Sequence, residues 1–226
     1  MTDRPILFSA PMVRAILDGT KTQTRRIVKP QPRDEWRPVV SHYYPTIIDR
    51  HGDEAPGQEV YGASDEVEGR KCPYGQPGDR LWVRETWAAH WMYNDVPPSA
   101  AQSERCDLRR TDNRWFAADG NGGPSQHGLE PDGLRGRWRP SIHMPRWASR
   151  ITLEVTGVRV ERLQDISEVD AQAEGCALEC MTPTGDDSGS AIYGPGGYLA
   201  LWEAINGAGA WDQNPWVWVV EFKPVV

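Results

Sequence analysis

Apolar and polar residues alternate along several short stretches of the chain, and a period of two is typical of a β-strand with one buried face. Alternating or short apolar runs predict strands at 4–8, 22–29, 79–88, 114–118, 151–163 and 216–223. Three other segments are predicted to be helices, at 10–18, 166–174 and 197–206. Gly19 and Gly207 follow the first and last of these, where glycine commonly ends a helix.

The order of these elements predicts the fold class. Too few helices separate the strands for a doubly wound parallel sheet. We therefore predict a mixed α/β (α+β) fold, in which short helices flank a small, mostly antiparallel β-barrel. Residues 31–77 and 92–136 are rich in proline, glycine and charged residues, so we expect them to be long loop insertions in a single domain spanning 1–226. The first insertion is expected to have little core of its own.

The charge of the chain is unevenly distributed. The formal net charge of −7 argues against a protein that coats nucleic acid. However, residues 1–40 have four more basic than acidic side chains, residues 135–162 have five more, and residues 165–226 hold ten acids and Lys223. If the two basic segments meet in the fold, they form a patch that attracts anions. Otherwise they are solvated faces, and the sequence leaves both interpretations open.

Other classes of protein are disfavoured by simpler features. The longest apolar runs fall well short of the roughly 18 residues that a membrane span needs. The first residues do not have the layout of a secretory signal. Cys72 and Cys106 stand apart, and Cys176 and Cys180 form a loose pair that lacks a zinc-site pattern. We therefore expect a cytoplasmic protein with no membrane, metal or cofactor, although a metal or redox role for that pair stays open.

Four segments resemble, in order, those of the ASCH family, and together they cover about half of the chain. They are Ile16 to Arg25 (ILDGTKTQTR), Gly78 to Glu85 (GDRLWVRE), Ile166 to Gly175 (ISEVDAQAEG) and Trp216 to Lys223 (WVWVVEFK). The resemblance implies that the barrel is PUA-like. The whole chain also resembles hypothetical proteins carried by phages and prophages, which implies a bacterial or phage-infected host cell.

The resemblance also implies a function. PUA domains bind RNA, and some small ASCH proteins are amidohydrolases that remove the acetyl group from N4-acetylcytidine. Those enzymes use a lysine, a threonine three residues later and a glutamate on the helix after the long strand, which match Lys21, Thr24 and Glu174. Other members are ribonucleases or non-catalytic nucleic-acid binders. The partner implied is therefore a nucleoside, RNA or another single-stranded nucleic acid, whereas catalysis and the oligomeric state are left undecided.

Elementary chemistry leaves three roles open for Lys21. As a base it must be neutral, which is costly near neutral pH, and Thr24 can then act as the nucleophile. Side chains three apart on a strand point to opposite faces, so this mechanism requires a bend at Lys21–Thr22. Alternatively, Lys21 stays charged, pairs with Glu174 and polarises a carbonyl or phosphate. In the third interpretation, the ion pair only fixes the helix to the barrel.

Further candidates have two interpretations each. Arg25 and Arg26 are phosphate contacts or solvated surface residues. Glu85 and Trp87, which share a strand face, line the cleft or belong to the outer barrel. His143 is an acid–base group or a packed histidine, while Arg146 and Trp147 suit phosphate contact and base stacking. A last hypothesis is that the insertions of a phage protein capture a host protein.

Overall fold

The computed structural model describes residues 2–97, 114–120, 135–175 and 195–225. The chain divides into two compact units. The first unit comprises residues 1–2, 20–79 and 154–223, and the second comprises residues 3–19, 80–153 and 224–226.

The first unit holds most of the strands and two of the α-helices. Its elements are β2 (Gln23–Ile27), β3 (Val39–Tyr43), β4 (Thr46–Ile48), β5 (Glu54–Pro56), β6 (Val60–Ser64), β7 (Gly69–Lys71), most of β11 (Thr152–Arg162), η8 (Leu163–Asp165), α2 (Glu168–Ala173), α3 (Pro195–Asn206) and nearly all of β12 (Trp216–Pro224). The second unit contains β1 (Asp3–Leu7), α1 (Ala10–Leu17), β8 (Arg80–Arg84), β9 (Trp87–Ala89), β10 (Arg114–Phe116) and the 3-10 turns η1 (Trp91–Tyr93), η5 (Ala117–Asp119), η6 (Ser141–His143) and η7 (Arg146–Ala148).

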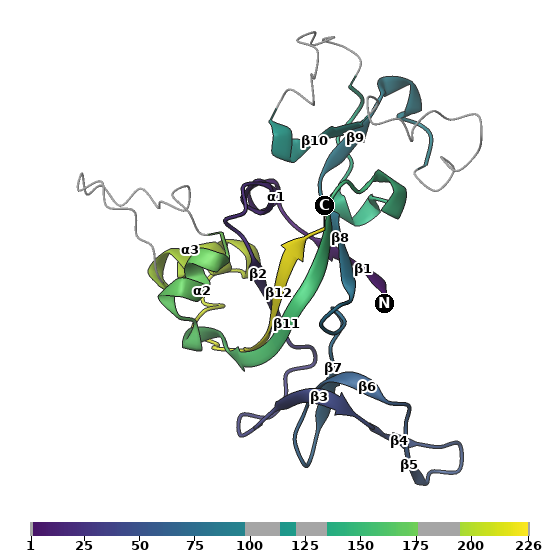
Figure 1. The fold of residues 1–226 in the computed structure, drawn as a ribbon, viewed down its shortest axis with the longest axis vertical. Helices are drawn as coiled ribbons and strands as arrows, with labels where there is room; N and C mark the ends of the chain where they lie inside the picture. Colours follow the sequence, from purple (N-terminus) through teal and green to yellow (C-terminus); the bar gives the residue numbers. More distant parts are fainter. Residues whose placement is uncertain (1, 98–113, 121–134, 176–194, 226) are drawn as a thin grey trace. The chain divides into compact units, whose positions relative to one another are not determined.

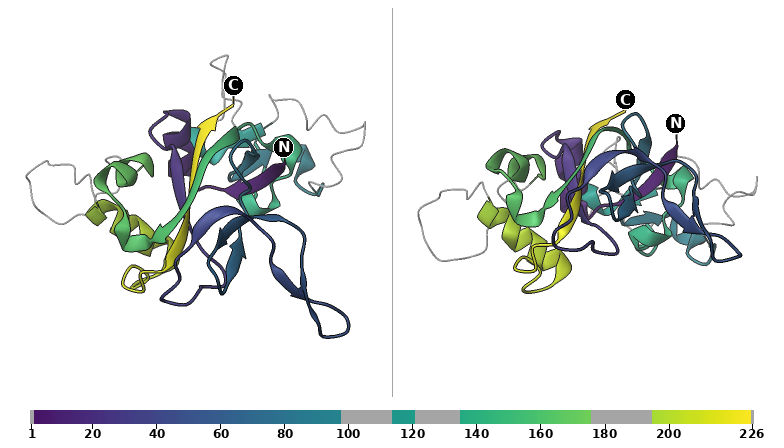
Figure 2. Two further views of the ribbon diagram at one scale, coloured as in Figure 1. Left: turned by 60° about the horizontal axis from the view of Figure 1, so that its bottom comes forward. Right: turned by 90° about the horizontal axis from the view of Figure 1, so that it is seen from below.

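A sheet covered by two helices forms the core of the first unit. Strands β11, β12 and β2 are neighbours in that order, and β12 pairs antiparallel with β2. Helices α2 and α3 lie together beside these strands (Figures 1 and 2). The residues buried between helices and sheet are Leu163, Ile166, Ala171, Tyr198, Trp202, Ala210, Val217 and Val219. This apolar layer fixes α2 against the strands.

Helix ends position the segment that carries the candidate site. Gly19 has a φ of +76°, a left-handed conformation that costs glycine little, and it follows α1 directly. Lys21 therefore begins a new segment two residues later. At the other side of the site, Ser167 caps α2 by accepting a hydrogen bond from the Asp170 amide at 3.1 Å.

Residues 31–77 have more structure than the sequence suggests. They form the antiparallel sheet β3–β6–β7 and the antiparallel pair β4–β5, and Trp36 and Ala63 are buried. Gly62 lies where the strands come closest, because a Cβ there would be 2.2 Å from the carbonyl oxygen of Arg70. These residues therefore form small sheets, and their buried Trp36 packs edge-on against Trp216 of β12, with ring centroids 5.4 Å apart.

The predicted α+β class with mostly antiparallel strands is confirmed, and every predicted helix and strand is present, although 79–88 is divided into β8 and β9. Strands β1 and β8 form a parallel pair. Cys72 is buried and free, whereas Cys106, Cys176 and Cys180 lie outside the described residues. Within the described ranges, none of the helices combines the length and apolar character needed to cross a membrane.

Helix α3 offers a matched pair of substitutions that tests the core. Trp202 is 4% exposed and Ile205, three residues later, is 54% exposed. We expect Trp202→Ala to lower the free energy of unfolding by about 3–5 kcal/mol, because it leaves a large cavity between helix and sheet. Ile205→Ala should change it by less than about 0.5 kcal/mol. Urea denaturation followed by circular dichroism measures both, and equal effects would contradict this packing.

Candidate functional site

Lys21 and Glu174 are in direct contact, although they are 153 positions apart in the chain. They form an isolated antiparallel bridge, which the Thr22 amide extends by donating to the Ala173 carbonyl at 2.9 Å. The Lys21 Nζ donates to both the main-chain oxygen and Oε2 of Glu174, each at 2.8 Å. Both side chains are buried, so this ion pair is largely withdrawn from water.

Arg25 shares the same glutamate. Its Nη1 donates to Glu174 Oε1 at 3.2 Å, so Lys21 and Arg25 engage different oxygens of one carboxylate. The guanidinium also binds Glu161, with Nε 3.1 Å from Oε1, and Nη2 is 3.3 Å from Asp170 Oδ2. Burial lowers the pKa of Arg25, but the charges of Glu174 and Glu161 outweigh burial and raise the pKa overall. Arg25 is therefore a cation in this site.

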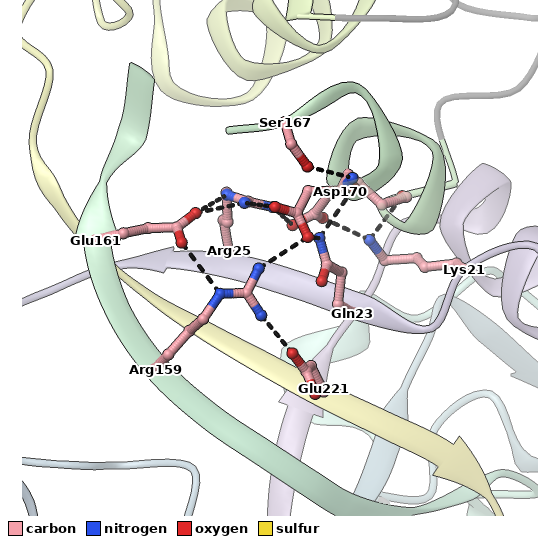
Figure 3. Close-up of polar contacts among 9 residues, drawn as sticks. Lys21, Gln23, Arg25, Arg159, Glu161, Ser167, Asp170 and Glu221 are labelled. Carbon is pink, nitrogen blue, oxygen red and sulfur yellow. Dashed lines mark hydrogen bonds and ion pairs between the residues drawn. The ribbon is translucent and has the colours of Figure 1, made fainter. Parts of the chain in front are cut away.

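A half-exposed arginine continues the cluster toward solvent. Arg159 contacts Glu161 Oε2 through Nε at 3.1 Å, Asp170 Oδ1 through Nη2 at 2.8 Å, and Glu221 through Nη1. Figure 3 shows its guanidinium between these three carboxylates. The side chain of Glu221 is 46% exposed, whereas Lys21 is fully buried. The polar cluster thus runs from the interior to the surface.

Asp170 takes part in the cluster through both its carboxylate and its main chain. Gln23 Nε2 donates to Asp170 Oδ1 at 3.1 Å and to its carbonyl oxygen at 2.9 Å. Burial raises the pKa of Asp170, but hydrogen bonding with Gln23 and Ser167 and the charges of Arg159 and Arg25 lower it to about 2. Asp170 is therefore ionised under physiological conditions.

Alternation along β2 separates Thr24 from this cluster. Lys21, Gln23 and Arg25 all contact α2 or its C-terminal residue, and Figure 3 shows them pointing the same way. Successive side chains of a strand point to opposite faces, so Thr24 and Arg26 belong to the other face. Thr24 is buried there, opposite Val220 in β12. The residue that joins Lys21 at Glu174 is therefore Arg25. The bend at Lys21–Thr22 that catalysis by Thr24 would require falls before β2, which begins at Gln23.

The remaining predicted residues belong to the second unit. Glu85 is buried, and both its oxygens bind Arg150, at 2.9 and 3.1 Å. Burial raises the pKa of Glu85. The hydrogen bond and the charge of Arg150 lower this pKa, but by less than burial raises it. The Trp87 ring is fully buried and packs edge-on against Trp147, with centroids 5.6 Å apart. His143 and Arg146 are exposed, in η6 and η7.

Sequence reasoning missed Gln23, Arg159, Glu161, Asp170 and Glu221. A signal was present in the strands, since Lys21, Gln23 and Arg25 are spaced by two, as are Arg159 and Glu161. Polar residues repeated on one face of a strand indicate that the face meets other polar groups. The sequence does not say which groups these are, and the partners of Gln23 and Arg25 lie more than 130 positions away.

The arrangement gathers three cations, Lys21, Arg25 and Arg159, among four carboxylates, those of Glu161, Asp170, Glu174 and Glu221. Charged donors and acceptors therefore stand side by side, and such groups form the stronger hydrogen bonds in proteins. Within the described ranges, histidine, cysteine, aspartate and glutamate side chains nowhere gather in a group of three that could hold a metal ion. The chemistry available is hydrogen bonding and charge stabilisation.

Comparison with known proteins adds no further constraint. The chain matches no protein-family model, no curated protein and no solved structure.

The depressed pKa of Asp170 predicts acid-sensitive stability. A carboxylate whose pKa is lower in the folded than in the unfolded state stabilises the fold at pH values above its unfolded-state pKa. For Asp170 this contribution is lost as the pH falls toward about 2, its pKa in the folded state. The side chain is 24% exposed, so solvent screening limits the contribution to about 1 kcal/mol. We expect wild type and Asp170→Asn to differ most near pH 6 and to converge near pH 2, by urea denaturation at each pH.

Asp212→Asn is the control, since Asp212 is an exposed carboxylate in a turn of the same unit. Its difference from wild type should stay nearly constant over the same pH range. A constant difference for Asp170→Asn would show that its carboxylate is not stabilised by the fold.

Proposed function

We propose that this chain is an ASCH-like protein with a PUA-like barrel, acting in the cytoplasm of a bacterium or a phage-infected cell. In this proposal it binds a nucleoside, free or within single-stranded RNA, at the cluster around Lys21, Arg25 and Glu174. The observation that carries it is the buried contact of Lys21 with Glu174. Lys21 and Glu174 are two of the three residues that the family resemblance singles out, and although they are far apart in the sequence they belong to one polar cluster.

The chemistry of the cluster suits a nucleobase. The edge of a base presents hydrogen-bond donors and acceptors next to each other. Lys21 and Arg25 supply charged donors, and Glu174 supplies an acceptor beside them. Each hydrogen bond to a charged group contributes about 1.5–3 kcal/mol, so two or three of them give a selective site.

In this proposal Lys21 acts as a cation. Its Nζ lies 2.8 Å from a carboxylate oxygen, and an adjacent negative charge favours the ammonium form of lysine. Arg25 binds the other oxygen of the same carboxylate, so Glu174 is held between two positive groups. Of the roles open to Lys21, this geometry favours polarising a carbonyl or a phosphate over removing a proton.

Amide hydrolysis of an N4-acylated cytidine is the second candidate, and the same Lys21–Glu174 contact favours it. Its difficulty is the nucleophile, because the pleat of β2 directs Thr24 away from Lys21. Hydrolysis through Thr24 requires β2 to rearrange, which would break the ion pairs of Arg25. Binding without turnover requires no such change, and we rank it first.

Conservative changes in the pair test the binding site. We expect Lys21→Arg and Glu174→Gln to weaken nucleoside binding at least about tenfold, because each disturbs a charged hydrogen bond worth about 1.4 kcal/mol or more. Isothermal titration calorimetry with cytidine and N4-acetylcytidine measures the affinity, and thermal melting checks the fold. Arg159→Gln, at the half-exposed end of the polar cluster, should weaken nucleoside binding at least threefold. This variant tests the site even if the variants at the buried residues do not fold. Unchanged affinity in folded variants would refute the site.

Thr24→Val separates the two candidates. It keeps the size of a buried side chain on the other face of β2, so we expect nucleoside affinity within twofold of wild type. We also expect wild type to release no acetate from N4-acetylcytidine beyond a buffer control, measured by chromatography of the products. Acetate release that disappears in Thr24→Val would make hydrolysis the function. Cleavage of a short RNA would make the protein a ribonuclease.

A further inference from the structure

One face of the β1–β8 pair in the second unit carries a line of arginines. The strands are parallel neighbours (Figure 1), and their register places Asp3, Pro5 and Leu7 beside Arg80, Trp82 and Arg84. These residues share a face, because alternate positions of paired strands point the same way. Asp3, Pro5 and Leu7 are exposed, whereas Ile6, Leu81 and Val83 on the opposite face are buried. The arginine-bearing face is therefore the outer one.

Trp82 holds two of the arginines in place. The guanidinium carbon of Arg84 lies 4.6 Å from the centroid of the Trp82 ring, and that of Arg146, from η7, lies 5.9 Å from it. Trp82 itself is only 7% exposed. Stacking on an aromatic ring restricts a guanidinium without using its outward N–H groups. Arg84 and Arg146 are thus presented in a restricted geometry.

The positive charge of this face is poorly neutralised. Of the described residues, none places a carboxylate within ion-pair distance of Arg80 or Arg84. Arg146 meets Asp3 at a long 3.4 Å, with both side chains 46% exposed. Arg84 donates only weakly to the Ile142 carbonyl, at 3.3 Å. Three arginines against one aspartate form a local excess of positive charge on a chain whose net charge is −7.

We propose that this face, formed by Arg80, Trp82, Arg84 and Arg146, binds the phosphate backbone of a single-stranded nucleic acid. All three cations are arginines, whose planar fork matches the two oxygens of a phosphate. Arg80 and Arg84 are four residues apart on a strand, which separates them by about 13 Å. That distance lets the two arginines bind different phosphates of one strand.

A single strand fits this face better than a duplex. Reading a duplex requires a helix, ribbon or arm that enters a groove, whereas an open sheet face accepts a splayed strand whose bases stack on aromatic rings or guanidinium planes. The inference goes beyond the proposed function, because Arg80, Trp82 and Arg84 have no part in the nucleoside site. It also has a separate test, since nucleosides lack the phosphate that these arginines would bind.

The experiment measures how the full chain binds a fluorescein-labelled oligouridylate of about 12 nucleotides, by fluorescence anisotropy at about 50 and 200 mM salt. We expect Arg80→Gln/Arg84→Gln to weaken binding at least about tenfold at the lower salt. Two lost phosphate contacts should also make the slope of log affinity against log salt shallower by about 1.4. An oligodeoxythymidylate of the same length distinguishes RNA from DNA.

Arg37→Gln/Arg50→Gln is the matched control, since both are exposed arginines of the first unit and the double substitution removes the same charge. It should bind within twofold of wild type. The inference is overturned if wild type does not bind the oligonucleotide, or if the double variant binds as well as wild type. Equal competition by polyglutamate would overturn it too, in favour of an acidic protein as the partner.

The two proposals can fail separately. Loss of oligonucleotide binding in Arg80→Gln/Arg84→Gln with nucleoside affinity intact supports the phosphate-binding face, whatever the outcome at Lys21. If the double variant lost cytidine affinity as well, its effect would not be confined to phosphate, and the inference would be refuted.

Discussion

The burial of Lys21 and Arg25 beneath α2 is the constraint on which the first unit depends. Removing a charge from water costs several kcal/mol, and a fold tolerates it only where opposite charges and hydrogen bonds replace the water. Here Glu174 meets both cations, and Glu161 and Asp170 complete the shell of Arg25. These carboxylates come from segments that enter the fold more than 130 positions later, so the pairing links distant parts of the chain.

The same pairing fixes the register of β2. A slip of one residue would turn Thr24 and Arg26 toward α2 and expose Lys21, Gln23 and Arg25 to the opposite side. Four carboxylates would then lose Lys21 and Arg25 and gain Arg26 alone, at a cost above that of a single apolar contact. The apolar layer of α2, α3 and β12 holds the helices on the sheet, whereas the ion pairs decide which side chains of β2 they cover.

The sequence predicts features that depend on neighbouring residues better than contacts between residues far apart in the chain. Strands and helices depend on local alternation and on residues such as Gly19, so their positions were predictable. The pairing of Lys21 with Glu174 came from resemblance, because periodicity carries no information about partners so far apart. The small sheets within residues 31–77 are not predictable from composition, since a glycine-rich and proline-rich segment looks like a loop. Gly62 is there because two strands approach too closely for a Cβ, which composition does not reveal.

Arginine is used in opposite ways in the two units. Arg25 is enclosed, and its guanidinium forms ion pairs with three carboxylates that offset the cost of burial. Arg80 and Arg84 are only partly buried on an outer face, and no carboxylate of the described residues forms an ion pair with them. A net charge of −7 does not cancel such a face, because at 0.1 M salt charges more than about 10 Å away are largely screened. The local arrangement of charge, and not its sum, therefore determines which anions an acidic protein can bind.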